Sequence, residues 1–502
     1  MKPQLDWSAY KEAGMGDAYA DIPRHGGDFA RAVAACINSR QCETTGKRVM
    51  CPSFQVSGNP NLSTGGRVRL LKAALSSDLV EQALADPELA EAMDLCVACK
   101  GCKRECEANV DMALIKAEFL AQRLPRTGLT PRARLFAHLP RLLHRLPWLK
   151  VLIRWRNRSP RLARLGQSLV GIAADRLLPE PAPCAFERVD ATAHQASIAG
   201  TDRGPDAKSG AVASAGAGSG FGSGPGPGPG SGSGSGPDPG TGSGFRDALP
   251  EVVLFVDTFS RHFEPDVAQA AISVLHAAGY RVLIAEPAAD DAEATRPLCC
   301  GRTYLAQGMV DEARAEVKRL VDGLLPHVEA GRLVVGLEAS CVLGLRDDAR
   351  ALGLGEALER IAGNVLLFEE FLAKELMAKR LKLSLCEADG SAVLVHGHCH
   401  QKAVGATKAM RRVLKLIPGQ AFSMIEAGCC GMAGTFGLEA EHAGMATAMA
   451  EQALLPALRA APDARVVANG FSCRAQMRAH GDYRARHLAV LLRDRLPEQQ
   501  MP

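Results

Sequence analysis

The sequence predicts a mixed fold class, with an α-helical N-terminal domain followed by an α/β domain of two repeats. Three observations predict it. The first half carries apolar residues at helical spacing, interrupted by prolines. Residues 204–244 are almost entirely Gly, Ser and Pro, which offer nothing to bury. The second half alternates strand-like and helical segments around a recurring Cys-Cys-Gly turn.

In the N-terminal half, the spacing predicts helices over 70–75, 79–93 and 112–123. We assign residues 1–125 to an α-helical domain and 126–200 to a basic helical region. This region is expected to form short helices because prolines break it at positions 125, 131, 140, 147 and 160. Residues 201–247 are expected to form a disordered linker.

The C-terminal half predicts strands over 252–259, 282–286 and 333–338, with helices between them. The same order recurs from the strand 392–399, through a second Cys-Cys-Gly turn, to a strand at 464–468. This is an internal repeat of roughly 120–140 residues. We place the first repeat at 248–388 and the second at 389–502, each with a parallel sheet whose carboxyl end collects ligands.

Charge and cysteine usage narrow the class of protein. The chain has 502 residues and a net charge of +4, yet residues 123–176 hold thirteen Lys or Arg against one acid, Asp175. The first twenty residues lack a signal-peptide pattern, and no apolar run reaches the ~18 residues of a membrane span. Fourteen of sixteen cysteines fall in motifs, all except Cys184 and Cys386. A cytoplasmic metal protein is therefore favoured over a disulfide-rich secreted one.

The segment CVACKGCKRECEANVDM carries cysteines at 96, 99, 102 and 106, the spacing of an iron–sulfur loop. In two-cluster ferredoxins the fourth cysteine of such a run binds the other cluster. Cys96, Cys99 and Cys102 therefore need a ligand from elsewhere, and Cys51 in MCPSF is the natural donor. We expect these four to hold a 4Fe-4S cluster in a ferredoxin-like domain.

A second, incomplete set is expected around Cys106. CINSRQC supplies Cys36 and Cys42, with Ser39 at the position where a third thiol would stand. Three thiolates suit a three-iron cluster, or a four-iron cluster completed by Ser39 or an outside ligand. Zinc also binds four thiolates and is the alternative, although a run of four cysteines at this spacing favours iron–sulfur. Glu107 replaces the proline common after such a run, which loosens the turn without removing a ligand.

The two Cys-Cys-Gly turns predict further metal or redox sites. A vicinal pair is a poor disulfide, but it can present two thiolates while glycine allows the turn. The second repeat offers four cysteines as ligands and the first repeat only three. In the first repeat, Thr258 and Phe259 occupy the place that corresponds to Cys399 of the second repeat. Three histidines around Cys399 raise the prospect of proton handling. The sets are Cys399, Cys429, Cys430 and Cys473, and Cys299, Cys300 and Cys341.

Seven ordered motifs carry a family resemblance: CINSRQC…MCPSF, LCVACKGCKRECEANVDM, CCGRTYLAQGMVDEAR, GLEASC, HGHCHQK, GCCGMAGTFG and NGFSCR. They resemble the iron–sulfur portion of FAD-linked oxidases of D-2-hydroxy acids, such as the glycolate oxidase iron–sulfur subunit or fused D-lactate and D-2-hydroxyglutarate dehydrogenases. The Cys-Cys-Gly repeats also look like those of heterodisulfide reductase and the anaerobic glycerol-3-phosphate dehydrogenase iron–sulfur subunit. The resemblance implies an electron-transfer subunit whose FAD lies on a partner chain, because no flavin-binding segment is found here.

Three functions stay open at this stage. The first is transfer of electrons from a partner flavin to a quinone or other acceptor. The second is thiol/disulfide redox catalysis at the second Cys-Cys-Gly site, and the third is a redox or oxygen sensor. The basic region either contacts anionic lipid on the inner face of the cytoplasmic membrane or docks an acidic partner. The basic region contains no nucleic-acid recognition motif, so its charge alone does not support nucleic-acid binding.

Overall fold

The computed structural model describes residues 1–13, 21–46, 48–187 and 249–498. The predicted linker at 201–247, and residues 188–200 of the basic region, lie outside the described residues. The described segments before and after them belong to one compact unit. The mixed fold class is confirmed, with helices first and parallel sheets after.

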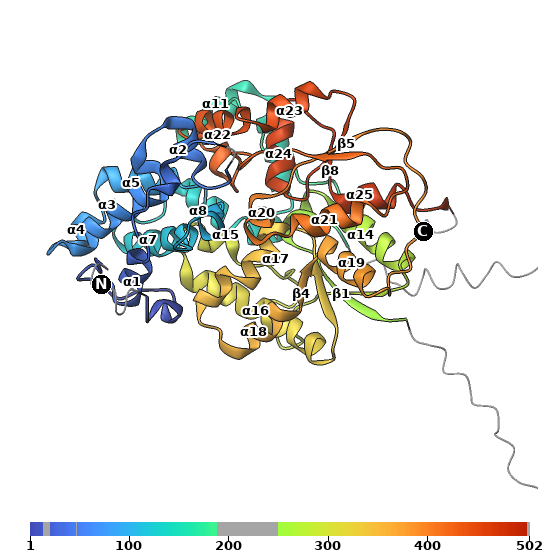
Figure 1. Cartoon of the computed structure of the whole chain (residues 1–502), viewed down its shortest axis with the longest axis horizontal. Coiled ribbons are helices and arrows are strands. Elements are labelled where there is room, and N and C mark those ends of the chain that lie inside the picture. The colour runs from blue at the N-terminus through green and yellow to red at the C-terminus, as the bar shows by residue number, and fades with distance from the viewer. Residues whose placement is uncertain (14–20, 47, 188–248, 499–502) are drawn as a thin grey trace, which may run out of the picture. The chain divides into compact units, whose positions relative to one another are not determined.

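The N-terminal half is helical, as predicted (Figure 1). Helix α7 differs from the prediction, because it runs through Pro125 and ends only at Thr127. The helix expected over 79–93 is divided by Asp86-Pro87, with Asp86 capping the second piece. The helices are α1 (Asp28–Ala34), α2 (Pro52–Ser57), α3 (Thr64–Ser76), α4 (Val80–Ala83), α5 (Pro87–Asp94), α6 (Gly101–Glu105) and α7 (Met112–Thr127).

Within residues 126–187, the part of the basic region that the structure describes, the chain forms four short helices, as its prolines predict. Pro131 and Pro160 occupy the first turns of two of them, where a missing N–H costs nothing. Thr130 and Ser159 cap these two helices by accepting a backbone N–H bond. The helices are α8 (Pro131–Ala137), α9 (Leu139–Arg145), α10 (Leu149–Arg158) and α11 (Pro160–Val170).

The first repeat contains a four-stranded parallel sheet of order β2-β1-β3-β4. Helices α16 and α18 pack against each other beside this sheet (Figure 1). Strand β4 and helices α18 and α19 were not predicted from the sequence. The elements are β1 (Glu251–Phe255), α13 (Thr258–His262), α14 (Pro265–Ala277), β2 (Arg281–Ile284), α15 (Arg302–Leu305), α16 (Val310–Glu329), β3 (Leu333–Gly336), α17 (Ala339–Arg346), α18 (Gly355–Asn364), β4 (Val365–Leu367) and α19 (Phe368–Met377).

The second repeat has the same topology, β6-β5-β7-β8, again wholly parallel. The two repeats join through helix pairs, α14 on α25 and α19 on α21, over a shared apolar core. The elements are β5 (Val393–Val395), α20 (Cys399–Val404), α21 (Thr407–Leu414), β6 (Phe422–Met424), α22 (Ala443–Glu451), α23 (Leu454–Ala460), β7 (Arg465–Val467), α24 (Phe471–Ala479), β8 (Ala485–Arg486) and α25 (Leu488–Arg493). No helix among the described residues is long and apolar enough to cross a membrane.

Candidate iron–sulfur centres

The first predicted cysteine set lines one small cavity. Cys96 ends the turn after α5, Cys99 and Cys102 enclose the start of α6, and Cys51 precedes α2. The loop bends tightly because Ala98, like Cys51, takes a left-handed backbone conformation. The four sulfur-bearing side chains in this lining thus come from two segments about fifty residues apart.

The environment of Cys51 suits a thiolate bound to metal. The backbone N–H of Thr64 donates to Cys51 Sγ at 3.0 Å, and the Thr64 hydroxyl lies 3.0 Å from the same sulfur. Such N–H···S bonds tune the potential of a cluster. Burial nevertheless raises the pKa of Cys51 to about 11 and raises that of Cys102 further. The metal-free thiols are therefore neutral, and a bound cation would be needed to hold them as thiolates.

The second predicted set also comes together. Burial raises the pKa of Cys36, and the thiols of Cys106 and Cys42 raise it further, so the three lie near enough to interact electrostatically. The N–H of Gly65 donates to Cys42 Sγ at 3.2 Å. Ser39, the proposed substitute for a fourth thiol, is exposed.

Glu107, which stands where a proline is common, has a structural partner. Gln41 donates its side-chain N–H to the Glu107 carboxylate at 3.1 Å. Since Gln41 precedes Cys42 and Glu107 follows Cys106, this bond holds the two cysteine segments together. A proline would lack this contact.

The second repeat gathers its four cysteines at the carboxyl ends of its strands. Cys399 begins α20 after β5, the pair 429–430 follows β6, and Cys473 lies in α24 after β7. All four are buried. A hydrogen bond from the Cys429 thiol lowers the pKa of Cys399 to about 6. Hydrogen bonds from Cys429 and Cys473 likewise lower the pKa of Cys430, whereas the pKa values of Cys429 and Cys473 themselves are raised.

Three histidines near Cys399 have different roles. His396 is fully buried beside Cys430, burial lowers its pKa to about 4, and neither of its ring nitrogens makes a hydrogen bond among the described residues. His398 caps α20 by accepting the N–H of His400 at 3.2 Å. His400 Nε2 lies 3.1 Å from the carbonyl oxygen of Ala98.

The first repeat assembles three cysteines and one threonine. Cys300 Sγ lies 3.0 Å from Cys341 Sγ, and Cys299 adjoins Cys300. Thr258 begins helix α13 after β1, as Cys399 begins α20 after β5, so this position of the first repeat carries a hydroxyl instead of a thiol. Cys184 and Cys386, which fall in no motif, are exposed.

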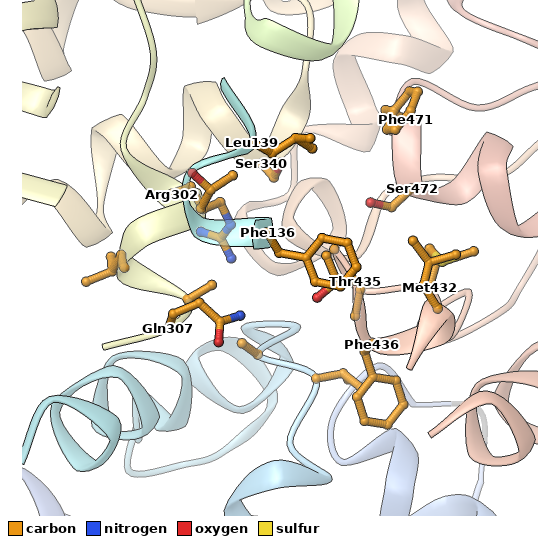
Figure 2. A pocket seen from close by; sticks show the side chains of 18 of the residues that line it. Phe136, Leu139, Arg302, Gln307, Ser340, Met432, Thr435, Phe436, Phe471 and Ser472 are labelled. Atoms are coloured by element: carbon orange, nitrogen blue, oxygen red, sulfur yellow. The ribbon is translucent and has the colours of Figure 1, made fainter. Parts of the chain in front are cut away.

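A cavity of about 380 Å³ lies between these cysteine sets. Its walls come from the Cys96 loop, from helices α8 to α10 and from both repeats, and its surface is mostly apolar. Figure 2 shows Arg302 and Gln307 on one side and Met432, Phe471 and Ser472 on the other. The cysteines in its lining are Cys96, Cys299, Cys300, Cys341 and Cys399.

A buried charge network, which the sequence did not reveal, joins the halves. Lys100 Nζ, inside the cysteine loop, lies 2.8 Å from an Asp111 oxygen and 3.0 Å from an Asp347 oxygen, and it also pairs with Asp348. Arg302, beside the first Cys-Cys-Gly turn, binds Asp348 at 2.6 Å. Lys100 lies within the cysteine motif that the sequence reveals. Nothing in the sequence, however, indicates that its partners are carboxylates nearly 250 residues away.

Comparison with known proteins finds a match in each half of the chain. Residues 32–110 match the family model described as a 4Fe-4S dicluster domain, and residues 393–478 match that of a cysteine-rich domain. The chain is 26% identical over 228 residues to D-2-hydroxyglutarate dehydrogenase of Escherichia coli (strain K12), covering 45% of this chain and 21% of the relative. It is 27% identical over 199 residues to one subunit of the anaerobic glycerol-3-phosphate dehydrogenase of the same strain, covering 38% of this chain and 46% of that subunit.

The chain thus spans about a fifth of the first relative and less than half of the second. The matched segments contain the loop with Cys96 to Cys106 and the second Cys-Cys-Gly turn. By these matches residues 32–110 resemble a 4Fe-4S dicluster domain and residues 393–478 a cysteine-rich domain, and the chain is similar to parts of these two dehydrogenases.

Proposed function

We propose that the chain is the electron-transfer subunit of a FAD-linked 2-hydroxy-acid dehydrogenase of the glycolate or D-lactate type. It would accept electrons from the flavin of a partner subunit and pass them to a quinone or other acceptor. One observation carries this proposal. Cys99 of the N-terminal loop and Cys399 of the second repeat lie in one buried cluster with Val97 and Phe436. Two metal-ligating sets are therefore neighbours, as electron transfer between them requires.

The proposed ligands follow the cysteine sets. Iron–sulfur clusters bound there would supply one-electron redox chemistry, and the chain's residues position them and set their potentials by burial and N–H···S bonds. The partly exposed pair Cys36 and Cys106 lies nearer solvent and suits the side that meets the flavoprotein. The sets are Cys51, Cys96, Cys99 and Cys102; Cys36, Cys42 and Cys106 with Ser39; Cys399, Cys429, Cys430 and Cys473; and, as a partial set, Cys299, Cys300 and Cys341.

The run of four cysteines at 96, 99, 102 and 106 supports an iron–sulfur cluster over a single zinc ion, because zinc sites commonly use cysteine pairs that lie well apart in sequence.

We propose that the protein acts in the cytoplasm, in peripheral contact with the inner face of the membrane. Support comes from α10 and α11, which combine exposed apolar side chains with arginines. The alternative is that an acidic partner protein docks on this basic region. That contact would use the same positive charges but not the exposed apolar side chains.

A thiol/disulfide catalyst is a second candidate function, and one observation favours it. Cys399 ionises near pH 6 and lines the central cavity, which is what a nucleophilic thiol needs. A redox sensor has no comparable support in the structure.

The test combines metal analysis with a flavoprotein assay. The chain is purified without oxygen, iron and sulfide are counted, and EPR spectra are taken before and after adding the co-purifying flavoprotein with hydroxy acid. Cluster reduction only in the presence of both supports the proposal. Zinc in place of iron would overturn it, and turnover of thiol or disulfide substrates by the chain alone would favour the second candidate.

A further inference from the structure

The central cavity borders three of the candidate metal or redox sites. It adjoins Cys96 of the first set, Cys300 and Cys341 of the first repeat, and Cys399 of the second repeat. Cys96 also lines the small cavity of its own set, so one wall separates the two spaces. Any molecule in the central cavity would thus stand within short reach of three candidate redox sites.

The size and lining of the cavity restrict the ligand. A volume of about 380 Å³ lies in the range of ~300–1,000 Å³ that holds small organic molecules. Aromatic side chains supply much of the wall, including Phe136, Phe436 and the stacked pair Phe259 and Phe471, whose ring centroids lie 4.8 Å apart. These walls fit a flat, apolar ring better than a charged acid.

Two polar side chains lie on opposite sides of this apolar space. Figure 2 shows Gln307 on one side and Ser472 on the other, with Phe136 and Thr435 between them. Neither the Gln307 amide nor the Ser472 hydroxyl makes a side-chain hydrogen bond in the described parts of the chain, whereas the nearby Thr303 hydroxyl donates to a backbone carbonyl at 2.9 Å. The Gln307 amide and the Ser472 hydroxyl are therefore two available donors on opposite walls, which suits a ring with two opposed carbonyl oxygens.

Helix α10 connects the cavity with a surface suited to lipid. Leu149 and Ile153 of this helix line the cavity, while Val151, Leu152 and Trp155 on its outer face are exposed. Helix α10 therefore forms part of the cavity wall and also exposes apolar side chains on the surface of the basic region. A hydrophobic ligand dissolved in lipid would meet this helix first.

We propose that the cavity is the binding site of a quinone, with its two carbonyl oxygens facing Gln307 and Ser472. The inference rests on the proposed function for its electrons. Two electrons from the iron–sulfur groups and two protons from solvent convert the two C=O groups of the quinone into the C–OH groups of the quinol. The structure thus gives a place to the acceptor that the electron-transfer role requires.

Binding is tested on the full chain, purified without oxygen and loaded with its clusters. The probe is an azido-benzoquinone that carries a decyl chain and is fully substituted, so that cysteine thiols do not add to its ring. After illumination, labelled peptides are identified by mass spectrometry, with unlabelled decylubiquinone as competitor. We expect competed label in the peptides of α8 to α10, α15 or α24 that wall the cavity.

Two variants locate the site. Ala306 lines the cavity at the end of α15 and is exposed, so Ala306→Trp fills the space without disturbing the core. The matched control is Ala378→Trp, at the exposed end of α19 and outside the cavity lining. We expect Ala306→Trp to weaken decylubiquinone binding about tenfold or more and the control to leave it unchanged. Gln307→Leu, which removes one donor, should weaken binding about fivefold.

The outcomes separate this inference from the proposed function. Label confined to the outer face of α10, or label in the cavity that neither Ala306→Trp nor Gln307→Leu reduces, would overturn the quinone site. If the same preparation still contains clusters that the flavoprotein reduces, the electron-transfer role stands without it. Competition by a disulfide in place of decylubiquinone would assign the cavity to thiol/disulfide chemistry.

Discussion

His400 Nε2 lies 3.1 Å from the carbonyl oxygen of Ala98, which joins the residue after Cys399 to the residue before Cys99. The Arg302 guanidinium lies 3.2 Å from the same ring nitrogen and so brings the first repeat to this junction. Three segments that carry candidate ligands therefore meet at one imidazole. Their relative positions depend on polar contacts within the protein, and these contacts can be tested by substitution.

We expect Lys100→Met to destabilise the folded protein strongly. The Lys100 side chain is 6% exposed and balances Asp111, which is 2% exposed, together with Asp348. Removing one partner from a buried pair leaves uncompensated charge and costs about 3–5 kcal/mol. The free energy of unfolding is measured by chemical denaturation without oxygen.

The matched control is Lys103→Met. Lys103 pairs with the same Asp111 and with Asp347, but its side chain is 39% exposed and water screens the charge. We expect a loss of at most about 1 kcal/mol. Equal losses for the two variants would show that burial of Lys100 does not matter for stability.

The sequence revealed local patterns and missed long-range partners. The spacing of Cys96, Cys99 and Cys102 and the proline after Cys51 indicated these four as one ligand set, and the structure places all four in the lining of one small cavity. The junction at His400 could not be predicted, since hydrogen-bond partners such as Ala98 lie about 300 residues away. No local period encodes such a contact.

The missed elements have a similar cause. Strands β6 (Phe422–Met424) and β8 (Ala485–Arg486) carry no β-branched residue, whereas the predicted strands β5 and β7 are rich in valine. They are strands because neighbouring β5 and β7 supply hydrogen bonds. Helix α7 continues through Pro125, since a proline near the last turn removes few backbone hydrogen bonds.

We expect the free energy of unfolding to fall as pH rises from about 4.5 to 7, because of the buried carboxyl of Glu369. Burial raises the pKa of this carboxyl from 4.5 to about 7, against the effect of hydrogen bonds from Gln401 and Asn469. The folded state therefore binds a proton between about pH 4.5 and 7 that the unfolded state has released. The contribution of Glu369 to the free energy of unfolding is fully present below pH 4.5. It declines by about 1.4 kcal/mol per pH unit up to about pH 7.

The variant Glu369→Gln should remove this pH dependence. Denaturation curves of both proteins are compared at several pH values between 5.5 and 7.5. The free energy of unfolding of the native protein, minus that of the variant, should decrease as pH rises. A constant difference across this range would mean that Glu369 titrates at its ordinary pKa.

We expect Ser39→Cys to complete the second cluster. Ser39 lies between Cys36 and Cys42 and is exposed, so a thiol fits there without repacking. If the native site holds a three-iron cluster, the variant should gain one iron atom per chain and lose the EPR signal of the oxidised three-iron form. The control is Ser8→Cys, an exposed serine far from these cysteines in sequence. Unchanged iron and EPR signals in Ser39→Cys would reject Ser39 as the position of the missing ligand.

The last prediction concerns the outer face of α10 and α11. Six large apolar side chains there are exposed, and Arg158, Arg161 and Arg164 form no ion pair with any residue that the structure describes. Apolar area and unpaired positive charge together predict binding to anionic lipid. The apolar side chains are Trp148, Val151, Leu152, Trp155, Leu165 and Leu169.

The full chain should sediment with vesicles of phosphatidylcholine and phosphatidylglycerol, and much less with phosphatidylcholine alone or at high salt. Trp155→Glu should reduce binding severalfold, because it places a negative charge on the apolar face at the lipid surface. Leu79→Glu is the matched control, since Leu79 is 61% exposed and Trp155 is 62% exposed. Equal binding of both variants, or binding only to an acidic protein partner, would assign the basic region to protein docking, because a lipid contact requires the apolar face as well as the charge.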